Sequence, residues 1–525
     1  MPFHDLRHEQ PRRIEADVAI IGGGAAGIAI AMELAHGPHR VALIESGDFA
    51  HRHRTQWLYR GRNVGRANIS TTFSRFRRFG GSTVRWGGQC RPLDPIDFEA
   101  GWPFGHSHLE PYYRRAQRAC HLGPYEYDPA RWHDAAGGPL PLASEFLQTR
   151  VYQFAHPRDF GAAYRDELER APNVDVWLNA NAVRIDMADC ADRVTSIAGA
   201  TLARRPFRIE ARHYVLACGG IENARLLLAS DGSRSGGIGN ERDLVGRYFM
   251  DHPYAFPGYF EPARGGHDRN YYVIEGYENT GAEQKMHAAF TLPERLRRDE
   301  GLNGCSVYLV RRPRYKTVPA YSSPAGRGLM HLIEVLQHRE LPDGRLGRSL
   351  RQIARDPGNA MRTIADRCRG AARKDPVLAL RACVEATPCR ESRVTLGSGF
   401  DRFGMRRPHV DWRLNDADKR GYERLLAVMQ SEFQRLGLGR VVVHGQCDPD
   451  GWPVTLIGGK HHMGTTRMSA NAADGVVDAD ARVHGTANLH VAGSSVFPTG
   501  GYANPTLTIV ALAIRLADRL KQHLA

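Results

Sequence analysis

The first part of the chain alternates short apolar runs with glycine turns and helical stretches. Residues 17–21 (DVAII) are apolar, and they lead into GGGAAG, a helical stretch and a second apolar run at 41–45 (VALIE). This order predicts a strand, a turn, a helix and a second strand. Apolar runs of the same kind occur at 174–184 and at 214–228, and the second of these again meets glycines before a helical stretch.

The pattern changes between about residues 255 and 450. Polar segments with Tyr, Arg and Pro are longer there, and β-like pieces such as 304–312 (GCSVYLVRR) and 392–397 (SRVTLG) stand between them. The last part of the chain returns to glycine turns and ends in an amphipathic helical stretch from Pro505. We therefore predict an α/β nucleotide-binding domain assembled from separated segments, with a second domain inserted between them.

The change of pattern also predicts the boundaries of these parts. The nucleotide-binding domain is assigned to 14–125, 160–254 and 455–525, the inserted domain to 255–454, and a connecting segment to 126–159.

Three glycines form GxGxxG between the first predicted strand and its helix. Gly22 permits a tight turn, Gly24 lets a pyrophosphate approach the main chain, and Gly27 lets helix and strand pack closely. Glu45 ends the next predicted strand, where a carboxylate can accept hydrogen bonds from both ribose hydroxyls. An acidic residue there favours FAD or NAD over NADP, because it repels a 2′-phosphate. The motif predicts a dinucleotide site without distinguishing FAD from NAD.

Length and composition favour a large globular protein. The chain has 525 residues, with 42% hydrophobic and 24% charged residues, which is typical of a globular protein with two domains or one large domain with an insert. No apolar run approaches the roughly 18 residues of a membrane-spanning helix. We expect a soluble protein without a transmembrane segment.

The amino terminus and the cysteines indicate a cytoplasmic protein. Arg12 and Arg13 form an arginine pair, but a strand and a glycine turn follow it in place of an apolar export segment. The nine cysteines are an odd number without a CxxC pair or a CxxCH haem signature, which is typical of reduced thiols. Export and a haem bound within the chain are therefore not expected.

The net charge of +14 would suit an anionic partner. The charge is scattered except at 344–374, which is dense in arginine with partly helical spacing. We favour a solvated pair of surface helices there over a docking patch for a partner or a membrane. No zinc-finger, RRM or basic-zipper pattern is present, so nucleic acid is not expected as a partner.

Two segments resemble the glucose-methanol-choline (GMC) oxidoreductases. Residues 80–88 read GGSTVRWGG, and residues 461–508 begin HHMGTTRM and contain GSSVFPTGGYANPT. The resemblance is closest to the branch with pyranose oxidases, fructose dehydrogenase large subunits and glucoside 3-dehydrogenases. Residues 101–116, 215–228 and 244–253 also look like family segments, whereas the resemblance fades between about 255 and 385.

The resemblance implies the fold, the cofactor and the catalytic pair. It implies a Rossmann-like FAD-binding domain that is discontinuous in sequence, and an inserted α+β substrate-binding domain containing an antiparallel sheet. The family's catalytic histidine, three residues before a GT pair, corresponds to His461, and the second catalytic position corresponds to Asn504. The role of the neighbouring His462 stays open.

The glycine motif and the resemblance together predict the cofactor contacts. The loop 80–88 is expected at the flavin edge, the main chain of Val183 at the adenine, and Gly493 and Ser494 near the ribityl chain and pyrophosphate. No metal ligand is predicted. The full set of expected contacts is Gly22, Gly24, Ala25, Ala26, Gly27, Glu45, Ser46, Gly80, Gly81, Ser82, Trp86, Gly87, Gly88, Val183, Ala217, Gly219, Gly493, Ser494, Pro505 and Thr506.

The sequence departs from part of the family at one position. In some pyranose oxidases a histidine in the loop that corresponds to GGSTVRWGG binds the flavin covalently. Arg85 stands at that place here, so the resemblance predicts FAD that is bound without a covalent link.

The two predicted catalytic residues suit alcohol oxidation. An alcohol is a poor hydride donor and its alkoxide a good one, so a base is needed at the hydroxyl. Histidine, with an ordinary pKa of about 6.5, is neutral and accepts protons near pH 7. Asn504 precedes Pro505, which is also the pattern of a plain helix start. Asn504 can start the helix and take part in the reaction at once, because its side chain can still bind the substrate hydroxyl.

The expected reaction is the oxidation of an alcohol group of a sugar or glycoside to a carbonyl by hydride transfer to flavin N5. A sterol, terpenoid, polyol or other natural-product alcohol is the alternative substrate, and a non-catalytic flavoprotein subunit is a further one. Oxygen, a quinone and a protein partner all stay open as the electron acceptor.

Overall fold

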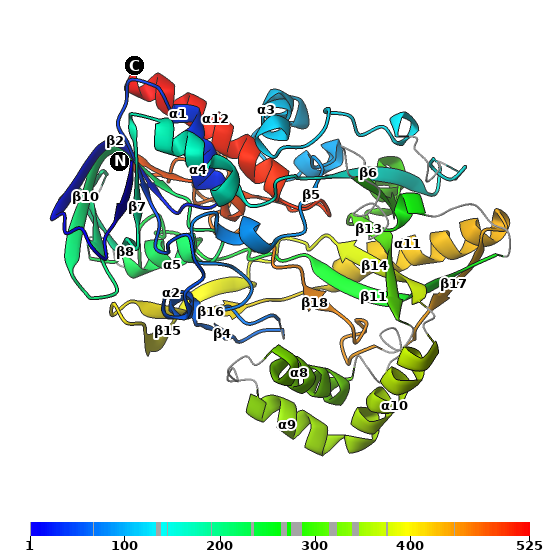
Figure 1. The fold of residues 1–525 in the computed structure, drawn as a ribbon. Coiled ribbons are helices and arrows are strands. Elements are labelled where there is room, and N and C mark those ends of the chain that lie inside the picture. The colour runs from blue at the N-terminus through cyan, green and yellow to red at the C-terminus, as the bar shows by residue number, and fades with distance from the viewer. Residues whose placement is uncertain are drawn as a thin grey trace.

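Two eight-stranded sheets and one three-stranded sheet make up the framework of the protein (Figure 1). The computed structural model describes residues 2–66, 68–132, 138–143, 145–190, 192–232, 236–263, 270–274, 286–313, 323–338, 346–373, 376–445 and 447–525.

The first sheet is largely parallel and carries the nucleotide motif. Its strands lie in the order β1-β7-β3-β2-β10-β9-β8, and β19 also pairs with β10. Strand β3 and the carboxyl-terminal parts of β2 and β10 are apolar and buried, as is typical where both faces of a parallel sheet are covered. Their bounds are β1 (Phe3–Asp5), β7 (Val174–Leu178), β3 (Val41–Ile44), β2 (Arg13–Ile21), β10 (Pro206–Leu216), β9 (Val194–Ala200), β8 (Asn181–Met187) and β19 (Leu489–Val491).

Helices cover this sheet on both sides. Helix α1 (Ala25–Leu34) is apolar almost all round, since it packs between the sheet and the last helix, α12 (Thr506–Leu524). Helix α12 also contacts α3 (His106–Ala119), and α4 (Phe160–Arg170) packs on α1. Helix α5 (Glu222–Ala229) follows β10 and contacts β8. Segments from both ends of the sequence thus share one buried core.

The second sheet is antiparallel and lies beside the first. Its strands follow the order β17-β11-β14-β13-β12-β6-β5, and β18 also pairs with β11. The bounds are β17 (Gly439–Val443), β11 (Pro253–Pro262), β14 (Pro376–Val384), β13 (Cys305–Pro313), β12 (Met286–Thr291), β6 (Gln148–Phe154), β5 (Gln89–Cys90) and β18 (Ile457–Gly458). The α/β class and the antiparallel sheet predicted from the sequence are confirmed.

Helix α11 (Asp416–Arg435) covers one face of the antiparallel sheet. Its apolar side chains share a core with the strands, and the ring of Phe433 lies 5.1 Å from both Phe260 and Phe290. Helix α6 (Glu294–Glu300) connects β12 and β13. The sheet also includes β6, which lies in the segment 126–159 predicted as a connection and pairs with β12.

A small sheet and a group of helices complete the fold. Strands β15 (Arg393–Phe400) and β16 (Arg406–Asp411) pair with β4 (Arg62–Asn63). Helices α8 (Pro324–His338), α9 (Leu346–Arg355) and α10 (Pro357–Arg373) stand together at the lower edge in Figure 1. Helices α9 and α10 occupy most of the arginine-rich stretch 344–374, of which residues 344, 345 and 374 lie outside the described part of the chain.

The predicted element at 174–184 is two strands. Strand β7 ends at Leu178 and β8 begins at Asn181, because Asn179 adopts a left-handed backbone conformation with a φ of 58°. Asparagine tolerates this conformation better than most residues. The other elements predicted at the start and end of the chain occur as β2, α1, β3 and α12. Among the described residues, no helix has the length and apolar character that a bilayer crossing requires.

Candidate active site

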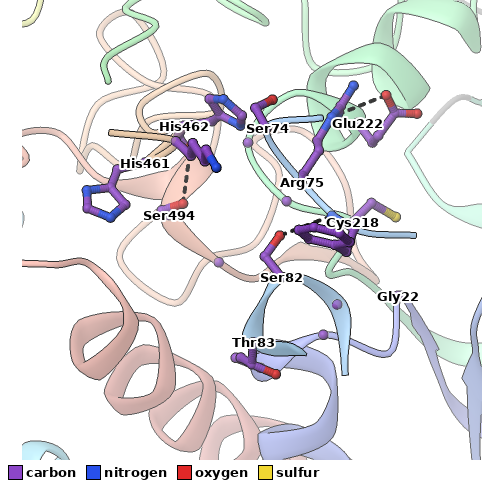
Figure 2. Close-up of a pocket in the computed structure, with 18 of the residues that line it drawn as sticks. Gly22, Ser74, Arg75, Ser82, Thr83, Cys218, Glu222, His461, His462 and Ser494 are labelled. Atoms are coloured by element: carbon purple, nitrogen blue, oxygen red, sulfur yellow. Dashed lines mark hydrogen bonds and ion pairs between the residues drawn. The ribbon is translucent and has the colours of Figure 1, made fainter. Parts of the chain in front are cut away.

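A cavity of about 580 Å³ opens at the carboxyl ends of β2, β3 and β10. Ligands of open parallel sheets usually bind at this edge, and the volume is typical of a cofactor or substrate site. Residues of the antiparallel sheet, including Tyr254 and Arg381, form another part of its wall. Figure 2 shows one side of the cavity with His461 and His462, and another with Gly22 and Thr83.

The glycine turn has the conformation that the motif predicts. Gly22 has a φ of +117°, which strongly favours glycine. A Cβ at Gly27 would lie 1.9 Å from the carbonyl oxygen of Gly22, so only glycine lets α1 approach β2. Gly24 lines the cavity directly before the first turn of α1. The positive end of α1 therefore faces the cavity, where it can stabilise a phosphate group.

Glu45 lies at the end of β3 and lines the same cavity. One carboxylate oxygen accepts a hydrogen bond of 2.9 Å from the main-chain N–H of Gly23, and the other accepts one of 2.7 Å from Gly47. These two bonds fix the carboxylate beside the glycine turn, as the ribose contact requires.

Sixteen of the twenty predicted cofactor contacts line the cavity: Gly22, Gly24, Ala25, Ala26, Glu45, Ser46, Gly81, Ser82, Trp86, Gly87, Ala217, Gly219, Gly493, Ser494, Pro505 and Thr506. The other four lie outside the lining residues. Gly27 and Gly80 support the walls, since a Cβ at Gly80 would lie 2.6 Å from Asp159, and Gly88 lies against the side chain of Arg158. Val183 does not line the cavity, whereas its neighbour Ala182 does.

The cavity walls fit a dinucleotide. Gly219 and Gly493 have φ values of +83° and +107°. A Cβ at either position would meet no described atom within 4 Å, so the main chain is accessible from the cavity. Together with the turn at Gly22 and the carboxylate of Glu45, these residues provide a phosphate site, a ribose acceptor and open main chain for a long cofactor.

His461 and Asn504 meet in this cavity, although they are far apart in sequence. The side-chain nitrogen Nδ2 of Asn504 lies 3.5 Å from Nε2 of His461. Asp251 positions the histidine by accepting a hydrogen bond of 2.7 Å from its main-chain N–H. The same carboxylate lies 3.3 Å from the N–H of Lys460, which has a left-handed φ of 67°. The carboxylate thus helps to hold a strained turn directly before the histidine.

A chain of hydrogen bonds determines which nitrogen of His461 carries the proton. Nε2 of His252 lies 2.8 Å from the carbonyl oxygen of Gly501, and a carbonyl can only accept, so this nitrogen is protonated. Nδ1 of the neutral His252 ring is then an acceptor, and it lies 2.8 Å from Nδ1 of His461. His461 therefore donates through Nδ1, and the lone pair on its unprotonated Nε2 faces the amide N–H of Asn504, which is a weak donor to it at 3.5 Å.

Burial keeps these rings neutral. Desolvation lowers the pKa of His252 to about 4. Desolvation, then the neighbouring His252 and His462, lower the pKa of His461 well below its ordinary value. Arg381 and Lys460 act in the same direction, because a positive charge disfavours an imidazolium ion. His461 is therefore an unprotonated base at neutral pH.

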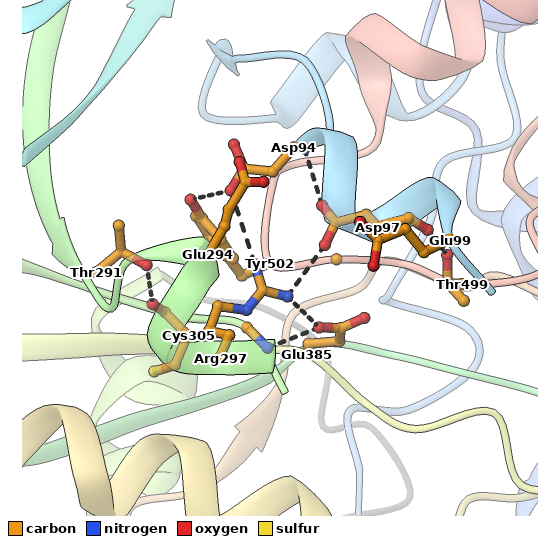
Figure 3. A network of polar contacts seen from close by, with 12 residues as sticks. Asp94, Asp97, Glu99, Thr291, Glu294, Arg297, Cys305, Glu385, Thr499 and Tyr502 are labelled. Carbon is orange, nitrogen blue, oxygen red and sulfur yellow. Dashed lines mark hydrogen bonds and ion pairs between the residues drawn. The ribbon is translucent and has the colours of Figure 1, made fainter. Parts of the chain in front are cut away.

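A buried network of charges lies behind the loop that carries Asn504 (Figure 3). Tyr502 donates a hydrogen bond of 2.6 Å to Asp94, and the guanidinium of Arg297 contacts Asp97 at 3.1 Å and Glu385 at 3.2 Å. A Cβ at Gly501 would lie 2.4 Å from the carboxylate of Asp97. The network therefore packs directly against the loop that provides the acceptor for His252 and the side chain of Asn504.

Several residues at the site were not predicted from the sequence. Asp251 and His252 belong to the segment 244–253 that resembles the family, which was a signal, although no role followed from it. Tyr254, Arg381 and Lys460 were not singled out. Arg381 comes from β14, in the region where the resemblance fades, and only the pairing of β14 with β11 brings it to the cavity.

Comparison with known proteins identifies the family. A family model described as GMC oxidoreductase matches residues 388–513, and one described as FAD dependent oxidoreductase matches residues 17–238. The chain is 25% identical to paromamine 6'-oxidase of Streptomyces fradiae, over 97% of this chain and 93% of that protein. It is 22% identical to the fructose dehydrogenase large subunit of Gluconobacter japonicus, over 97% and 98% of the two chains.

A solved structure agrees at the level of the fold. The crystal structure of pyridoxine 4-oxidase from Mesorbium loti is similar with a TM-score of 0.59 at 15% identity, covering 97% of this chain and 99% of that one. The two family matches and the two relatives that span the whole length of the chain agree with the resemblance in its sequence. The chain belongs to the GMC oxidoreductases and is an FAD-dependent oxidoreductase.

Proposed function

We propose that the protein oxidises an alcohol group of a sugar or glycoside to a carbonyl group, with His461 as the base. The observation that carries the proposal is the unprotonated Nε2 of His461, which lies 3.5 Å from the amide nitrogen of Asn504 in the cavity that also contains the glycine turn. A hydroxyl between these groups can donate to the histidine and accept from the asparagine. Both interactions favour loss of the hydroxyl proton.

The residues of the chain account for the movement of the proton. His461 takes the hydroxyl proton at Nε2, while its Nδ1–H remains bonded to His252. The amide of Asn504 stabilises the negative charge that develops on the substrate oxygen. The bound flavin supplies the hydride acceptor at its N5 position. Helix α12 begins at Thr506, two residues after Asn504, so its positive end faces the reaction.

A polar wall near His461 favours a sugar over an apolar alcohol. The ring of Tyr254 lies 6.0 Å from that of His461, and the guanidinium of Arg381 lies over Tyr254 at 4.5 Å. Lys460 lines the same part of the cavity. Two of the relatives, which are named for paromamine and fructose, support the same substrate class. Oxidation of a sterol, terpenoid or polyol remains the second candidate.

The substrate class is tested by mixing the oxidised enzyme with candidate alcohols in the absence of oxygen. We expect sugars and glycosides to bleach the visible flavin band, and sterols and terpenoid alcohols to leave it unchanged. Arg381→Met should raise KM for the sugar more than it lowers kcat, because it removes a polar group from the wall of the cavity but leaves His461 and Asn504 in place.

Two results would contradict this proposal. If only the apolar alcohols bleached the flavin band, the substrate would be a sterol or terpenoid alcohol and not a sugar. Bleaching by none of the compounds, with FAD bound, would favour a non-catalytic flavoprotein subunit.

We further propose that FAD is bound without a covalent link, through the residues predicted from the glycine motif and the family. Arg85 lines the cavity at the position where some pyranose oxidases carry the linking histidine. A guanidinium stays protonated and is a poor nucleophile. Acid precipitation should therefore release intact FAD into the supernatant, as measured by its chromatographic mobility. Flavin fluorescence that stays with the precipitated protein would refute this.

The cysteines support the cytoplasmic location expected from the sequence. All nine cysteines are free thiols, and four of them are buried: Cys90, Cys120, Cys305 and Cys383. Reduced thiols are typical of a cytosolic protein.

A further inference from the structure

Three histidines gather on the parallel sheet away from the active-site residues. His213 lies on β10, His490 on β19 and His523 in the last turn of α12. In the parallel pairing of these strands, Val215 lies opposite His490. His213 is two residues before Val215, and side chains alternate along a strand, so His213 and His490 project from the same face of the sheet. The end of α12 adds the third ring to this face.

The three rings are close and their nitrogens converge. The ring centres of His213 and His490 are 5.6 Å apart, and His523 lies 5.8 Å and 6.3 Å from these two rings. Each ring offers one nitrogen such that the three nitrogens all lie within 4.8 Å of one another. In the described part of the chain, these three histidines form the one group of histidine, cysteine or carboxylate side chains with ligand atoms close enough to share a metal ion.

Among the described residues, the buried nitrogens of His213 and His490 lack well-directed hydrogen-bond partners. The side chain of His490 is 0% exposed, and among the described residues neither of its ring nitrogens has a well-directed hydrogen-bond partner. Nδ1 of His213 is also buried, and no described residue binds it. Buried polar atoms are rarely left in this state, and an ion that the coordinates lack is one common reason for it.

We propose that His213, His490 and His523 bind one transition-metal ion of the zinc class, which joins the end of α12 to the parallel sheet. Three neutral imidazoles suit Zn²⁺, Cu²⁺ or Ni²⁺, whereas Mg²⁺ and Ca²⁺ prefer oxygen ligands. His523 is exposed, so water can occupy the fourth position of a tetrahedral ion.

A small rearrangement completes the site. With Zn–N bonds of about 2.0 to 2.1 Å, the nitrogens of a tetrahedral ion are about 3.4 Å apart. The present separations of up to 4.8 Å therefore have to shorten by up to about 1.4 Å. Changes of the side-chain torsions, above all at the exposed His523, can bring the three nitrogens this much closer together.

The surroundings of the rings are compatible with a cation. A neutral imidazole has a lone pair on one of its two ring nitrogens, so each of these rings can bind a metal ion. The main-chain carbonyl of Asp480 favours a proton on the His490 ring, as the outer partner of a metal-bound imidazole does. Three arginines lie near the rings and disfavour a positive charge there: Arg193, Arg212 and Arg482. Arg482 is paired with Asp478 at 3.1 Å and Arg212 with Asp17 at 3.8 Å, which reduces their repulsion of the ion.

The position of the site gives the ion a structural role. Helix α12 has 19 residues, and at 1.5 Å per residue it is about 28 Å long. The histidine cluster is at its last turn, whereas Asn504 lies just before its first turn. The ion therefore takes no part in the oxidation. It holds the far end of the helix whose near end borders the active site.

The proposal is tested by adding Zn²⁺ to the flavin-loaded enzyme after removal of metals with a chelator. We expect saturable binding of one ion per chain by calorimetry, and a rise in the midpoint of thermal unfolding. Mg²⁺ should cause neither effect. His523→Ala should weaken Zn²⁺ binding by at least about tenfold. Replacing a residue that only contacts a metal ligand already lowers the affinity by about that much, and His523 is itself a proposed ligand.

The control is His53→Ala, which removes an exposed histidine that lies near His51 on another surface. This variant should bind Zn²⁺ as the unchanged enzyme does. His523→Ala should retain FAD and its rate of substrate oxidation, because His523 lies outside the active-site cavity. Unchanged Zn²⁺ binding in His523→Ala, or no binding to the unchanged enzyme, would overturn the proposal.

Discussion

Replacement of His461 by alanine is expected to slow reduction of the flavin by substrate by roughly 10²- to 10⁴-fold while FAD stays bound. The substitution removes the unprotonated Nε2, which lies beside Asn504. It leaves the main-chain N–H that Asp251 binds, so the turn at Lys460 should keep its structure. Anaerobic stopped-flow measurement of the flavin band gives the rate directly.

Two further measurements separate the loss of a base from damage to the fold. Added imidazole should partly restore the rate of His461→Ala, because it can occupy the space that the side chain leaves. His484→Ala serves as the control, since this histidine lies in the same carboxyl-terminal region but outside the lining of the active-site cavity. A near-normal rate in His461→Ala would remove this residue from the mechanism.

The pH dependence of the unchanged enzyme tests the same histidine. The reaction requires the neutral ring, and burial lowers the pKa of His461 well below its ordinary value. Protonation therefore begins only at lower pH, and the rate of flavin reduction should stay constant down to about pH 6.5. An acid limb with its midpoint at or above that pH would show that another group, or an unshifted histidine, controls the reaction.

Replacement of Arg297 by methionine is expected to lower the free energy of unfolding by about 3 to 5 kcal/mol. Arg297 is 4% exposed and contacts the buried carboxylates of Asp97 and Glu385. Methionine fills much of the same volume, but above the Asp97 pKa of about 8 it leaves both carboxylates without their cation. Unfolding in urea, followed by circular dichroism, measures the loss.

The neighbouring arginine provides a matched control. Arg298 also forms ion pairs, at 2.6 Å with Glu99 and 3.3 Å with Glu294, but its side chain is 45% exposed. Water solvates and screens such a pair, so Arg298→Met should lower the free energy of unfolding far less than Arg297→Met does. Equal losses in the two variants would mean that the buried network is not important for stability.

The loss in Arg297→Met should become smaller as the pH is lowered. Burial raises the pKa of Asp97 to about 8 even with Arg297 present, and removal of the cation raises it further. The folded variant therefore binds more protons than the folded unchanged protein only between about pH 8 and the higher pKa of Asp97 in the variant. Lowering the pH through this range stabilises the variant more than the unchanged protein, so the loss becomes smaller there and stays constant at lower pH.

Sequence and structure contributed differently to the cofactor site. The site is built from a local motif, in which Gly22, Gly24 and Gly27 follow one strand and Glu45 ends the next. Such a motif acts through the main chain of adjacent residues, so its spacing in sequence is enough to predict it. The prediction was weaker for Val183, because a contact from a more distant strand depends on how β7 turns into β8 at Asn179.

The catalytic pair illustrates what a family resemblance can predict and what it cannot. His461 and Asn504 could be named because both lie in one segment that resembles the family. The proton on His461, however, is directed by His252 and Gly501, and the main chain of His461 by Asp251. Hydrogen bonds between segments 200 to 250 residues apart leave no periodic signal in a single sequence.

The sequence by itself determined the nucleotide motif, the α/β class and the family, and it predicted the residues proposed to react, since each depends on local spacing or on a continuous segment. Only the tertiary structure decided which residues line the substrate side of the cavity, how Arg297 pairs with three distant carboxylates, and that His213, His490 and His523 meet. The physical reason is that strand pairing and helix packing set these contacts, and both join residues whose separation along the chain carries no information about their distance in space.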